Sequence, residues 1–315
     1  MLIWIVGQGG LLGSAIARTA KNLATINIFL ADPISWDNSE LARIEFSGLS
    51  ERFAMEAGDA PWAIIWSAGH ATVASSEDDT AKELEALTTL CESVKRNTPR
   101  GDGAFFLSSS AGGVYAGSQN PPFTIETEPA PLSAYGRLKL AQEDSARTQL
   151  SGICPVIIGR ISNLYGPGQD LSKLQGLISA LARAAVTRKP INMFVSLDTI
   201  RDYIYADDAA AQILGIVHDA AHSSSSAASS RTLILASGQP VSLGYLINLV
   251  HDVARIKVPV ALGAHSSAAA QSRDLRLIPT VTDLREQMPS TPLAAGVKNV
   301  YLDVLQRVQR ARSLS

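Results

Sequence analysis

Three side chains with complementary chemistry occur in one stretch of the sequence: Ser110, Tyr135 and Lys139. Ser110 ends a serine triplet after the apolar run 105–107, which predicts a hydroxyl at the carboxyl end of a buried strand. Tyr135 and Lys139 are four residues apart in a helical pattern, so their side chains share one helix face. A phenol titrates at about pH 10 and is a poor base, but a close cation favours the phenolate. This spacing predicts a tyrosine that exchanges a proton with a substrate hydroxyl.

A glycine-rich turn after the apolar run that opens the chain predicts a dinucleotide site. Glycines stand at positions 7, 9, 10 and 13, just before a helical pattern begins. Gly7 allows a tight turn out of the strand, and Gly13 allows the helix to pack close to the sheet. Gly9 and Gly10 carry no Cβ that would keep a pyrophosphate away from the backbone.

Residues around this turn indicate which dinucleotide is bound. The N–H groups of Leu11 and Leu12 open the helix and face the phosphates with a partial positive charge. Asp32 comes nineteen residues after Gly13, at the end of the second apolar run. A carboxylate there accepts both adenosine ribose hydroxyls and repels a 2′-phosphate, so NAD is favoured over NADP. Asp32 also fits a turn before Pro33, and a glycine-rich turn alone also occurs without a ligand.

The two motifs complement each other chemically. An oxidised nicotinamide is a cation, so with Lys139 it favours the phenolate of Tyr135. Ser110 would hydrogen-bond the substrate oxygen, and Lys139 would also hold the nicotinamide ribose. Taken alone, Tyr135 and Lys139 also fit a surface helix pair, and the serines fit a polar loop. Their order after a dinucleotide turn favours a hydride-transfer site.

Short apolar runs alternate with amphipathic stretches along the chain. These patterns predict the strands and helices that position the residues named above. Runs that are apolar on both faces are typical of buried parallel strands. Repeated strand-helix-strand order predicts an α/β fold with a Rossmann-type doubly wound sheet and a smaller α/β substrate lobe. The predicted strands are 2–6, 26–31, 63–67, 104–107, 155–158, 204–205 and 233–235. The predicted helices are 11–23, 80–96, 133–150, 171–186 and 243–254, with Asp207 or Asp208 capping a further helix after 204–205. The polar tracts 222–230 and 264–272 predict loops.

Composition is that of an ordinary globular protein and excludes several partners. The chain has 315 residues, 46% hydrophobic and 18% charged, so two packed lobes are expected. A net charge of −2 offers no basic field for nucleic acid or a membrane surface. Cys91 and Cys154 are expected to be buried free thiols, and the five histidines show no metal spacing. With no stretch of membrane-spanning length and no basic leader, a cytoplasmic location is predicted.

Four segments carry a resemblance to a known family. They are FFLSSSAGGVYAG at 105–117, PLSAYGRLKLAQE at 131–143, GRISNLYGPG at 159–168 and RDYIYADD at 201–208. In this order they resemble motifs of the extended short-chain dehydrogenase/reductase family, specifically its NAD-dependent nucleotide-sugar epimerases and dehydratases. The resemblance covers nearly the whole chain. It gives Ser110 the place of the catalytic serine or threonine, with one extra residue before Val114-Tyr115.

This resemblance implies two domains and a dimeric assembly. The NAD-binding domain would comprise residues 1–163 and about 202–237. The lobe that binds a nucleotide-diphosphate sugar would comprise about 164–201 and 238–315. A homodimer that pairs helices 80–96 and 133–150 across a two-fold axis is implied as well.

Individual roles follow from the same resemblance. Asn163 would line the substrate pocket. Arg201 would face the diphosphate, which suits its planar guanidinium, although it also fits an ion pair with the adjacent acids. Ala68 and Gly69, after the strand at 63–67, take the place of small residues beside the cofactor. The family often has an asparagine early in the next helix, where this chain has Lys-Glu-Leu-Glu at 82–85.

The residues after Ser110 narrow the reaction. Family members that eliminate water or decarboxylate carry an acidic residue near this point, whereas Ala111, Gly112 and Gly113 follow here. An NAD-dependent 4-epimerase, which oxidises and re-reduces one sugar carbon, is therefore the first hypothesis. A nucleotide-ketosugar reductase or dehydrogenase with exchangeable NAD(P) would use the same residues. A non-catalytic NAD-binding sensor on the same fold is a third hypothesis.

Overall fold

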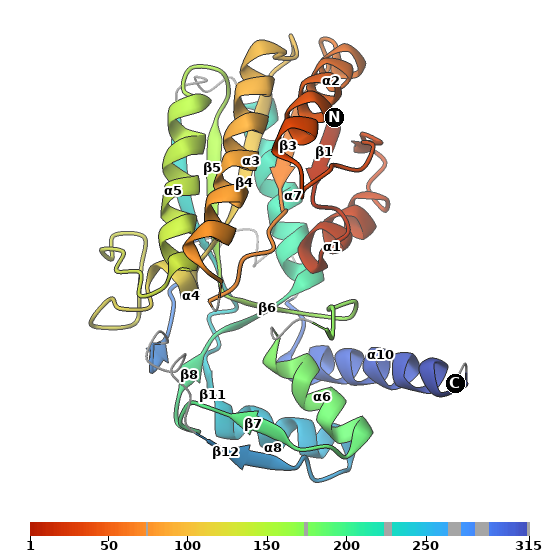
Figure 1. Ribbon diagram of the computed structural model, residues 1–315, viewed down its shortest axis with the longest axis vertical. Coiled ribbons are helices and arrows are strands. Elements are labelled where there is room, and N and C mark those ends of the chain that lie inside the picture. The colour runs from red at the N-terminus through yellow and green to blue at the C-terminus, as the bar shows by residue number, and fades with distance from the viewer. Residues whose placement is uncertain (74, 173–175, 224–228, 264–271, 281–289, 314–315) are drawn as a thin grey trace.

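A six-stranded parallel sheet forms the larger of two lobes in the computed structural model (Figure 1). The structure describes residues 1–73, 75–172, 176–223, 229–263, 272–280 and 290–313. The strands are β1 (Leu2–Val6), β2 (Asn27–Ile28), β3 (Trp62–Trp66), β4 (Gly103–Ser110), β5 (Val156–Ile161) and β10 (Ser230–Leu235). Their order across the sheet is β10-β5-β4-β3-β1-β2.

The connectivity places a ligand edge between β1 and β3. The chain passes from β1 outward to β2 and then crosses back to β3 on the other side of β1. Ligands of doubly wound sheets bind at such a switch point, outside the carboxyl ends of the strands. Strands β1, β3 and β5 are buried along their whole length, which explains why their sequences are apolar on both faces.

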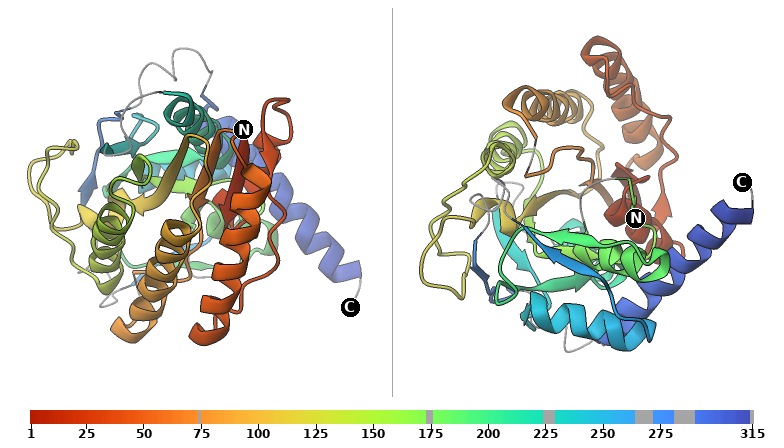
Figure 2. Two further views of the ribbon diagram at one scale, coloured as in Figure 1. Left: turned by 90° about the horizontal axis from the view of Figure 1, so that it is seen from above. Right: turned by 60° about the horizontal axis from the view of Figure 1, so that its bottom comes forward.

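Helices cover both faces of this sheet. One face packs against α1 (Leu11–Ala20) and α7 (Ala206–His222). The other face packs against α2 (Ser39–Ala57), α3 (Glu77–Arg96) and α5 (Ala134–Gln149), which lie side by side in Figure 2. Helices α3 and α5 also contact each other through a hydrogen bond between the hydroxyls of Thr88 and Ser145. Dimerisation through these two helices stays a prediction.

The second lobe lies below the sheet in Figure 1, with the short helix α4 (Ala111–Val114) and strand β6 (Asn163–Tyr165) at the junction. Its core is formed by α6 (Leu177–Thr187), α8 (Leu243–Ala254) and α10 (Leu293–Ser313). The short strands of this lobe and of the junction are β7 (Ile191–Met193), β8 (Ile200–Arg201), β9 (Tyr203–Tyr205), β11 (Val241–Ser242), β12 (Val260–Leu262) and β13 (Asp274–Leu275). They form the small sheets β11-β8-β13, β12-β7 and β6-β9.

The predicted fold class is confirmed, and several element boundaries differ from prediction. The predicted strand 26–31 contracts to β2, because this edge strand pairs only with β1 and Leu30 is 81% exposed. Helix α6 begins at Leu177 and not at Leu171, which lies in a turn. Most of the predicted loops 222–230 and 264–272 lies outside the described residues.

One helix was not predicted from the sequence, and the predicted cap of another is wrong. Helix α2 was not predicted because Leu41, Ile44 and Met55 are exposed, so its apolar residues do not gather on one face. Neither Asp207 nor Asp208 caps α7, because the helix already begins at Ala206. Asp207 instead pairs with Arg18 of α1 at 2.6 Å, and Asp208 accepts hydrogen bonds from Thr291.

Two bulk expectations can be compared with the described residues. Cys91 and Cys154 are both buried and free, as predicted, and burial raises the pKa of the Cys154 thiol to about 12. Within the ranges described above, every helix is too short or too polar to cross a bilayer.

Candidate active site

The glycine turn between β1 and α1 forms the first part of the candidate site. Gly7 has a φ of 88°, a conformation that side chains with a Cβ rarely adopt. A Cβ on Gly13 would overlap the carbonyl oxygen of Gly7, so this glycine is required by the packing of α1 on the turn. Gly9 differs, because no atom beyond its two neighbours in the chain lies within 4 Å of the position of its missing Cβ. The fold therefore does not require glycine at position 9, which suits a turn kept open for a ligand.

The start of α1 suits an anion. Its N-cap residue is Gly10, which makes no side-chain capping hydrogen bond, and its first turn contains no acidic residue. The first N–H groups of a helix have no partner within the helix, and they favour negative charge. Gly9 and Gly10 are exposed in front of Leu11 and Leu12. These features fit the pyrophosphate of a dinucleotide.

Asp32 lies beyond the end of β2, where an adenosine ribose would be bound in such a fold. Its carboxylate accepts a hydrogen bond from Arg52 of α2 at 2.7 Å, and the side chain is 74% exposed. Arg52 was not predicted from the sequence to belong to this site. Its guanidinium also lies 4.9 Å from the ring centroid of Phe29, which holds it beside Asp32.

Ser110 is the last residue of β4 and the N-cap of α4. Its hydroxyl oxygen accepts a hydrogen bond from the N–H of Gly113 at 3.1 Å. This bond fixes the side chain at the carboxyl edge of the sheet, and the hydroxyl can still donate its own proton.

Tyr135 and Lys139 lie on the first turns of α5, as predicted. The helix begins where the Ser133 hydroxyl accepts a hydrogen bond from the N–H of Gly136. The Lys139 Nζ lies 5.5 Å from the centroid of the Tyr135 ring. Lys139 is buried, and its ammonium donates to Gln142 at 2.8 Å and pairs with Glu83 at 3.2 Å.

Two glycines bring the Ser110 and Tyr135 segments together. A Cβ on Gly136 would overlap the carbonyl oxygen of Gly113, so α5 and α4 are in direct backbone contact. A Cβ on Gly113 would lie 3.0 Å from Cε1 of Tyr135, so the phenol ring lies against α4, which begins just after Ser110. The serine, tyrosine and lysine therefore share one end of the sheet.

A buried polar network beneath these residues was not predicted. Glu143, one turn after Lys139 on α5, accepts hydrogen bonds from Ser109 at 2.6 Å and from Arg160 of β5 at 2.8 Å and 3.0 Å. Arg160 also donates to the hydroxyl of Tyr115 at 2.7 Å. Both charged side chains are buried and paired, so the network links β4, β5 and α5 beside the candidate site.

Ala68 and Gly69 follow β3, next to the glycine turn. A Cβ on Gly7 would collide with the backbone of Ala68, which places the two turns in contact. A Cβ on Gly69 would lie 3.2 Å from the Oε1 atom of Glu83. Glu83 thus lies between this segment and Lys139, and it belongs to the Lys-Glu-Leu-Glu run in which the chain departs from the family pattern.

Asn163 and Arg201 lie at the junction of the lobes, on β6 and β8. The Asn163 amide nitrogen donates to the carbonyl oxygen of Asp202 at 2.9 Å. Arg201 is only 9% exposed and donates to the carbonyl oxygen of Ile200. Burial lowers its pKa, which the charges of Tyr203 and Asp274 only partly oppose.

The expected alternative for Arg201, an ion pair with adjacent acids, does not occur among the described residues. The carboxylate of Asp202 accepts instead from the N–H and hydroxyl of Ser237. Asp274 pairs with Arg276 at 2.9 Å. A buried guanidinium with no carboxylate partner in the described chain is suited to an anionic ligand.

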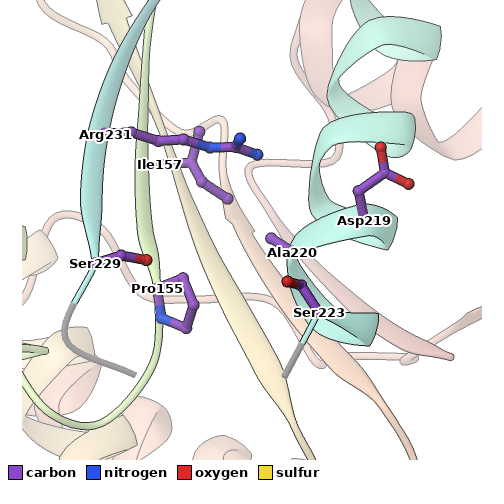
Figure 3. Close-up of a pocket in the computed structure, with 7 residues that line it drawn as sticks. All are labelled: Pro155, Ile157, Asp219, Ala220, Ser223, Ser229 and Arg231. Atoms are coloured by element: carbon purple, nitrogen blue, oxygen red, sulfur yellow. The ribbon is translucent and has the colours of Figure 1, made fainter. Parts of the chain in front are cut away.

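Two cavities lie away from the predicted catalytic residues. One of about 350 Å³ lies at the amino ends of β5 and β10, where Figure 3 shows Arg231 and Asp219 on opposite sides. A second, of about 100 Å³, lies beside Tyr165, Tyr203 and Tyr205. Neither cavity is lined by Ser110, Tyr135 or Lys139, so neither is assigned to the reaction.

Comparison with known proteins places this geometry in a family. A model of the NAD dependent epimerase/dehydratase family matches residues 3–226. The dTDP-L-rhamnose 4-epimerase of Burkholderia thailandensis is 39% identical over 96 residues, which are 30% of this chain and 26% of that protein. The dTDP-4-dehydro-6-deoxyglucose reductase of Escherichia coli is 33% identical over 105 residues, 32% of this chain and 33% of the reductase. The structure of UDP-glucuronic acid 4-epimerase from Bacillus cereus, in complex with UDP-glucuronic acid and NAD, matches with a TM-score of 0.77 at 16% identity, covering 98% of this chain and all of that one.

Since the family model matches well over half of the chain, the chain belongs to the NAD-dependent epimerase/dehydratase family. It is an enzyme of this family with NAD as its cofactor, which confirms the resemblance seen in the sequence motifs. The aligned region spans about a quarter of the curated epimerase and a third of the curated reductase. Because these relatives catalyse different reactions, family membership leaves the particular reaction open.

Proposed function

We propose that this chain is a nucleotide-sugar 4-epimerase that oxidises and re-reduces one sugar carbon. The observation that carries the proposal is the contact of the Tyr135 ring with α4, which begins just after Ser110, with Lys139 on the next turn of the same helix. The three side chains thus come from segments that are in contact near the carboxyl edge of the sheet. This edge is where a doubly wound sheet binds its dinucleotide.

Each of the three residues would have a defined role. Tyr135 would take the proton of a sugar hydroxyl during oxidation and return a proton during reduction. The positive charge of Lys139 would stabilise the phenolate, and its ammonium would hold the nicotinamide ribose. Ser110 would donate a hydrogen bond to the reacting sugar oxygen. When bound, NAD accepts a hydride in the first step and returns it in the second.

The cofactor would lie across the two turns that follow β1 and β3. The backbone at Gly9 and the opening N–H groups of α1, at Leu11 and Leu12, would hold the pyrophosphate. Asp32 would accept the hydroxyls of the adenosine ribose. Ala68 and Gly69 would lie beside the nicotinamide half. The exposed glycine turn and the uncapped start of α1 support this placement.

A nucleotide-diphosphate sugar would bind at the junction of the lobes. Arg201 would neutralise the diphosphate, which would give its buried guanidinium an ion-pair partner that it does not have among the described residues. Asn163 would contact the sugar from β6. On this proposal, about residues 164–201 and 238–315 form the substrate lobe, and residues 1–163 and about 202–237 bind NAD.

The residues after Ser110 favour epimerisation over elimination. Ala111, Gly112 and Gly113 begin α4 and carry no carboxylate that could act as a general acid. The partial match to a 4-epimerase supports the same choice. A nucleotide-ketosugar reductase is the second candidate, because a reductase also matches part of the chain and would need the same three residues.

A panel of nucleotide sugars with different bases and sugars separates these functions. The purified protein is first examined by absorbance and fluorescence for retained NAD(H), and the products are then assigned by their stereochemistry. A 4-epimerase yields the 4-epimer with no net change in NAD. Stoichiometric consumption of NADH or NADPH with a ketosugar would assign a reductase instead. Cofactor binding without turnover across the panel would assign a sensor.

A further inference from the structure

Glu83 joins the catalytic helix to the segment that follows β3. Its side chain is 10% exposed. One carboxylate oxygen lies 3.2 Å from the Lys139 ammonium and accepts from the Gln142 amide at 3.2 Å. The other oxygen accepts from the N–H groups of His70 at 2.9 Å and Ala71 at 3.0 Å. The carboxylate therefore has four donors, which come from α5 and from the loop after Gly69.

This carboxylate is held in its charged form. Burial raises the pKa of Glu83, but the Lys139 charge and the hydrogen bonds from Ala71 and His70 outweigh burial and leave it below its ordinary value. The pair of Glu83 and Lys139 is therefore close to neutral as a whole. The neighbouring charged residues Lys82 and Glu85 are exposed. Neither takes part in the ion pair between Glu83 and Lys139.

The position of Glu83 brings its charge next to the proposed nicotinamide site. Gly69 lies directly against Glu83, since a Cβ on Gly69 would be 3.2 Å from the Oε1 atom. In the proposed function, Gly69 and Lys139 both flank the nicotinamide half of NAD, and the present inference rests on that placement. NAD⁺ and NADH carry the same adenosine and diphosphate and differ in the charge of the nicotinamide ring. A fixed carboxylate nearby attracts the cationic ring and has no such effect on the neutral one.

We propose that Glu83 is a positioning residue that holds Lys139 in place and makes the site prefer the oxidised cofactor. A neutral amide at position 83 has only one acceptor oxygen, so it would lose the hydrogen bonds of one carboxylate oxygen and would also leave the Lys139 charge uncompensated beside the nicotinamide. The carboxylate removes that repulsion. An enzyme that begins each turnover by oxidising a sugar needs its resident cofactor as NAD⁺, and Glu83 would favour this resting state.

The test measures the dissociation constants of NAD⁺ and NADH for each variant, by calorimetry and by NADH fluorescence, without any substrate. For Glu83→Gln, the ratio of the NAD⁺ to the NADH dissociation constant is expected to rise about tenfold, as expected for removing one charge at this range in a partly buried site. Glu85→Gln removes the same charge from an exposed position of α3, where the side chain accepts from Ser39, and is expected to leave the ratio unchanged. A merely structural role for Glu83 would weaken both forms equally and leave the ratio where it was.

Lys139→Gln supplies an independent arm with the opposite sign. It removes the ammonium and leaves the carboxylate, so the ratio is expected to fall even though both affinities weaken. The double variant Glu83→Gln/Lys139→Gln should restore a ratio near that of the parent chain. If Glu83→Gln does not fold, the double variant decides the proposal against Lys139→Gln: a ratio above that of Lys139→Gln supports the role of Glu83, and an equal ratio overturns it.

The possible failures are distinguishable. A ratio that stays constant in every folded variant, while both cofactor forms still bind, overturns the role of Glu83 and leaves the proposed function intact. If both forms bind but Lys139→Gln changes neither affinity, Lys139 does not contact the nicotinamide half, and the proposed site itself is wrong.

Discussion

Arg52 donates a hydrogen bond to Asp32 across 2.7 Å while its guanidinium lies over the ring of Phe29. The carboxylate proposed to bind the adenosine ribose thus already has a cationic neighbour from α2. Asp32 retains further lone pairs for ribose hydroxyls, since a carboxylate accepts about four hydrogen bonds. On the proposed assignment of Asp32, the choice between NAD and NADP would depend on both members of this pair.

Replacing Asp32 by alanine should change cofactor preference. Asp32→Ala is expected to weaken NAD binding about tenfold and to improve NADP binding relative to NAD, because the released guanidinium of Arg52 can pair with a 2′-phosphate. The double variant Asp32→Ala/Arg52→Ala should lose the gain for NADP. Asp59→Ala breaks a similarly exposed pair with Arg100 and serves as the control. Calorimetry with both cofactors checks the result, and identical affinities for all variants would contradict the ribose assignment.

Removing the phenolic hydroxyl should separate binding from turnover. Tyr135→Phe keeps the ring that packs against Gly113 and is expected to bind NAD normally while its turnover falls about 10³-fold, since it lacks the group that exchanges the proton. Tyr301→Phe on α10 makes the same chemical change outside the candidate site and should retain full activity. Turnover by Tyr135→Phe at the parent rate would rule out this residue as the base.

Two glycines of the first turn should respond to alanine in opposite ways. Gly13→Ala is expected to lower the free energy of unfolding by about 2 kcal/mol, because the new Cβ overlaps the carbonyl oxygen of Gly7. The new methyl group of Gly9→Ala meets no atom beyond its neighbours in the chain within 4 Å, so this variant should unfold at or slightly above the parent temperature. It should nevertheless bind NAD about tenfold more weakly, since the methyl group enters the space proposed for the pyrophosphate. Thermal denaturation and NAD titration of both variants test the pair, and tight NAD binding by Gly9→Ala would move the pyrophosphate elsewhere.

Arg201 is expected to strengthen nucleotide binding and to lower the free energy of unfolding. Its lowered pKa means that the folded state disfavours the cation, and this cost is present at every pH below the folded pKa, including neutral pH. The free energy of unfolding of Arg201→Met is therefore expected to exceed that of the parent by about 1 kcal/mol.

The same variant should bind UDP or dTDP at least about tenfold more weakly, which is measured by calorimetry. Arg276→Met is the control, because Arg276 is paired with Asp274. A marked loss of stability in Arg201→Met with unchanged nucleotide affinity would make the guanidinium a structural group.

Local signals were sufficient for the elements that carry the candidate site. The glycine spacing, the apolar strands and the i,i+4 relation of Tyr135 and Lys139 are each set by a few neighbouring residues, and the structure has α1 and α5 where these signals place them. The motif order also led to the family. Long-range partners could not be read in this way, because they depend on which helices become neighbours.

Glu83 shows that difference most clearly. In the sequence it is one of several acids on an exposed-looking helix, and only the packing of α3 on α5 places it against Lys139. The bonds of Glu143 to Ser109 and Arg160 join three elements and have no signal in any one of them. Helix α2 was not predicted for a local reason: several of its apolar residues face solvent and obscure the helical pattern.

The backbone contact between Gly113 and Gly136 has a mechanical consequence. It joins α4, which directly continues β4, to α5, so Ser110, Tyr135 and Lys139 are carried by elements in direct contact, whereas Arg201 lies on a strand of the other lobe. A hinge movement between the lobes would change the contacts of Arg201 with the nucleotide without altering the spacing of the proton-transfer groups. Because the two are independent, the same three residues could act on substrates of different length and shape.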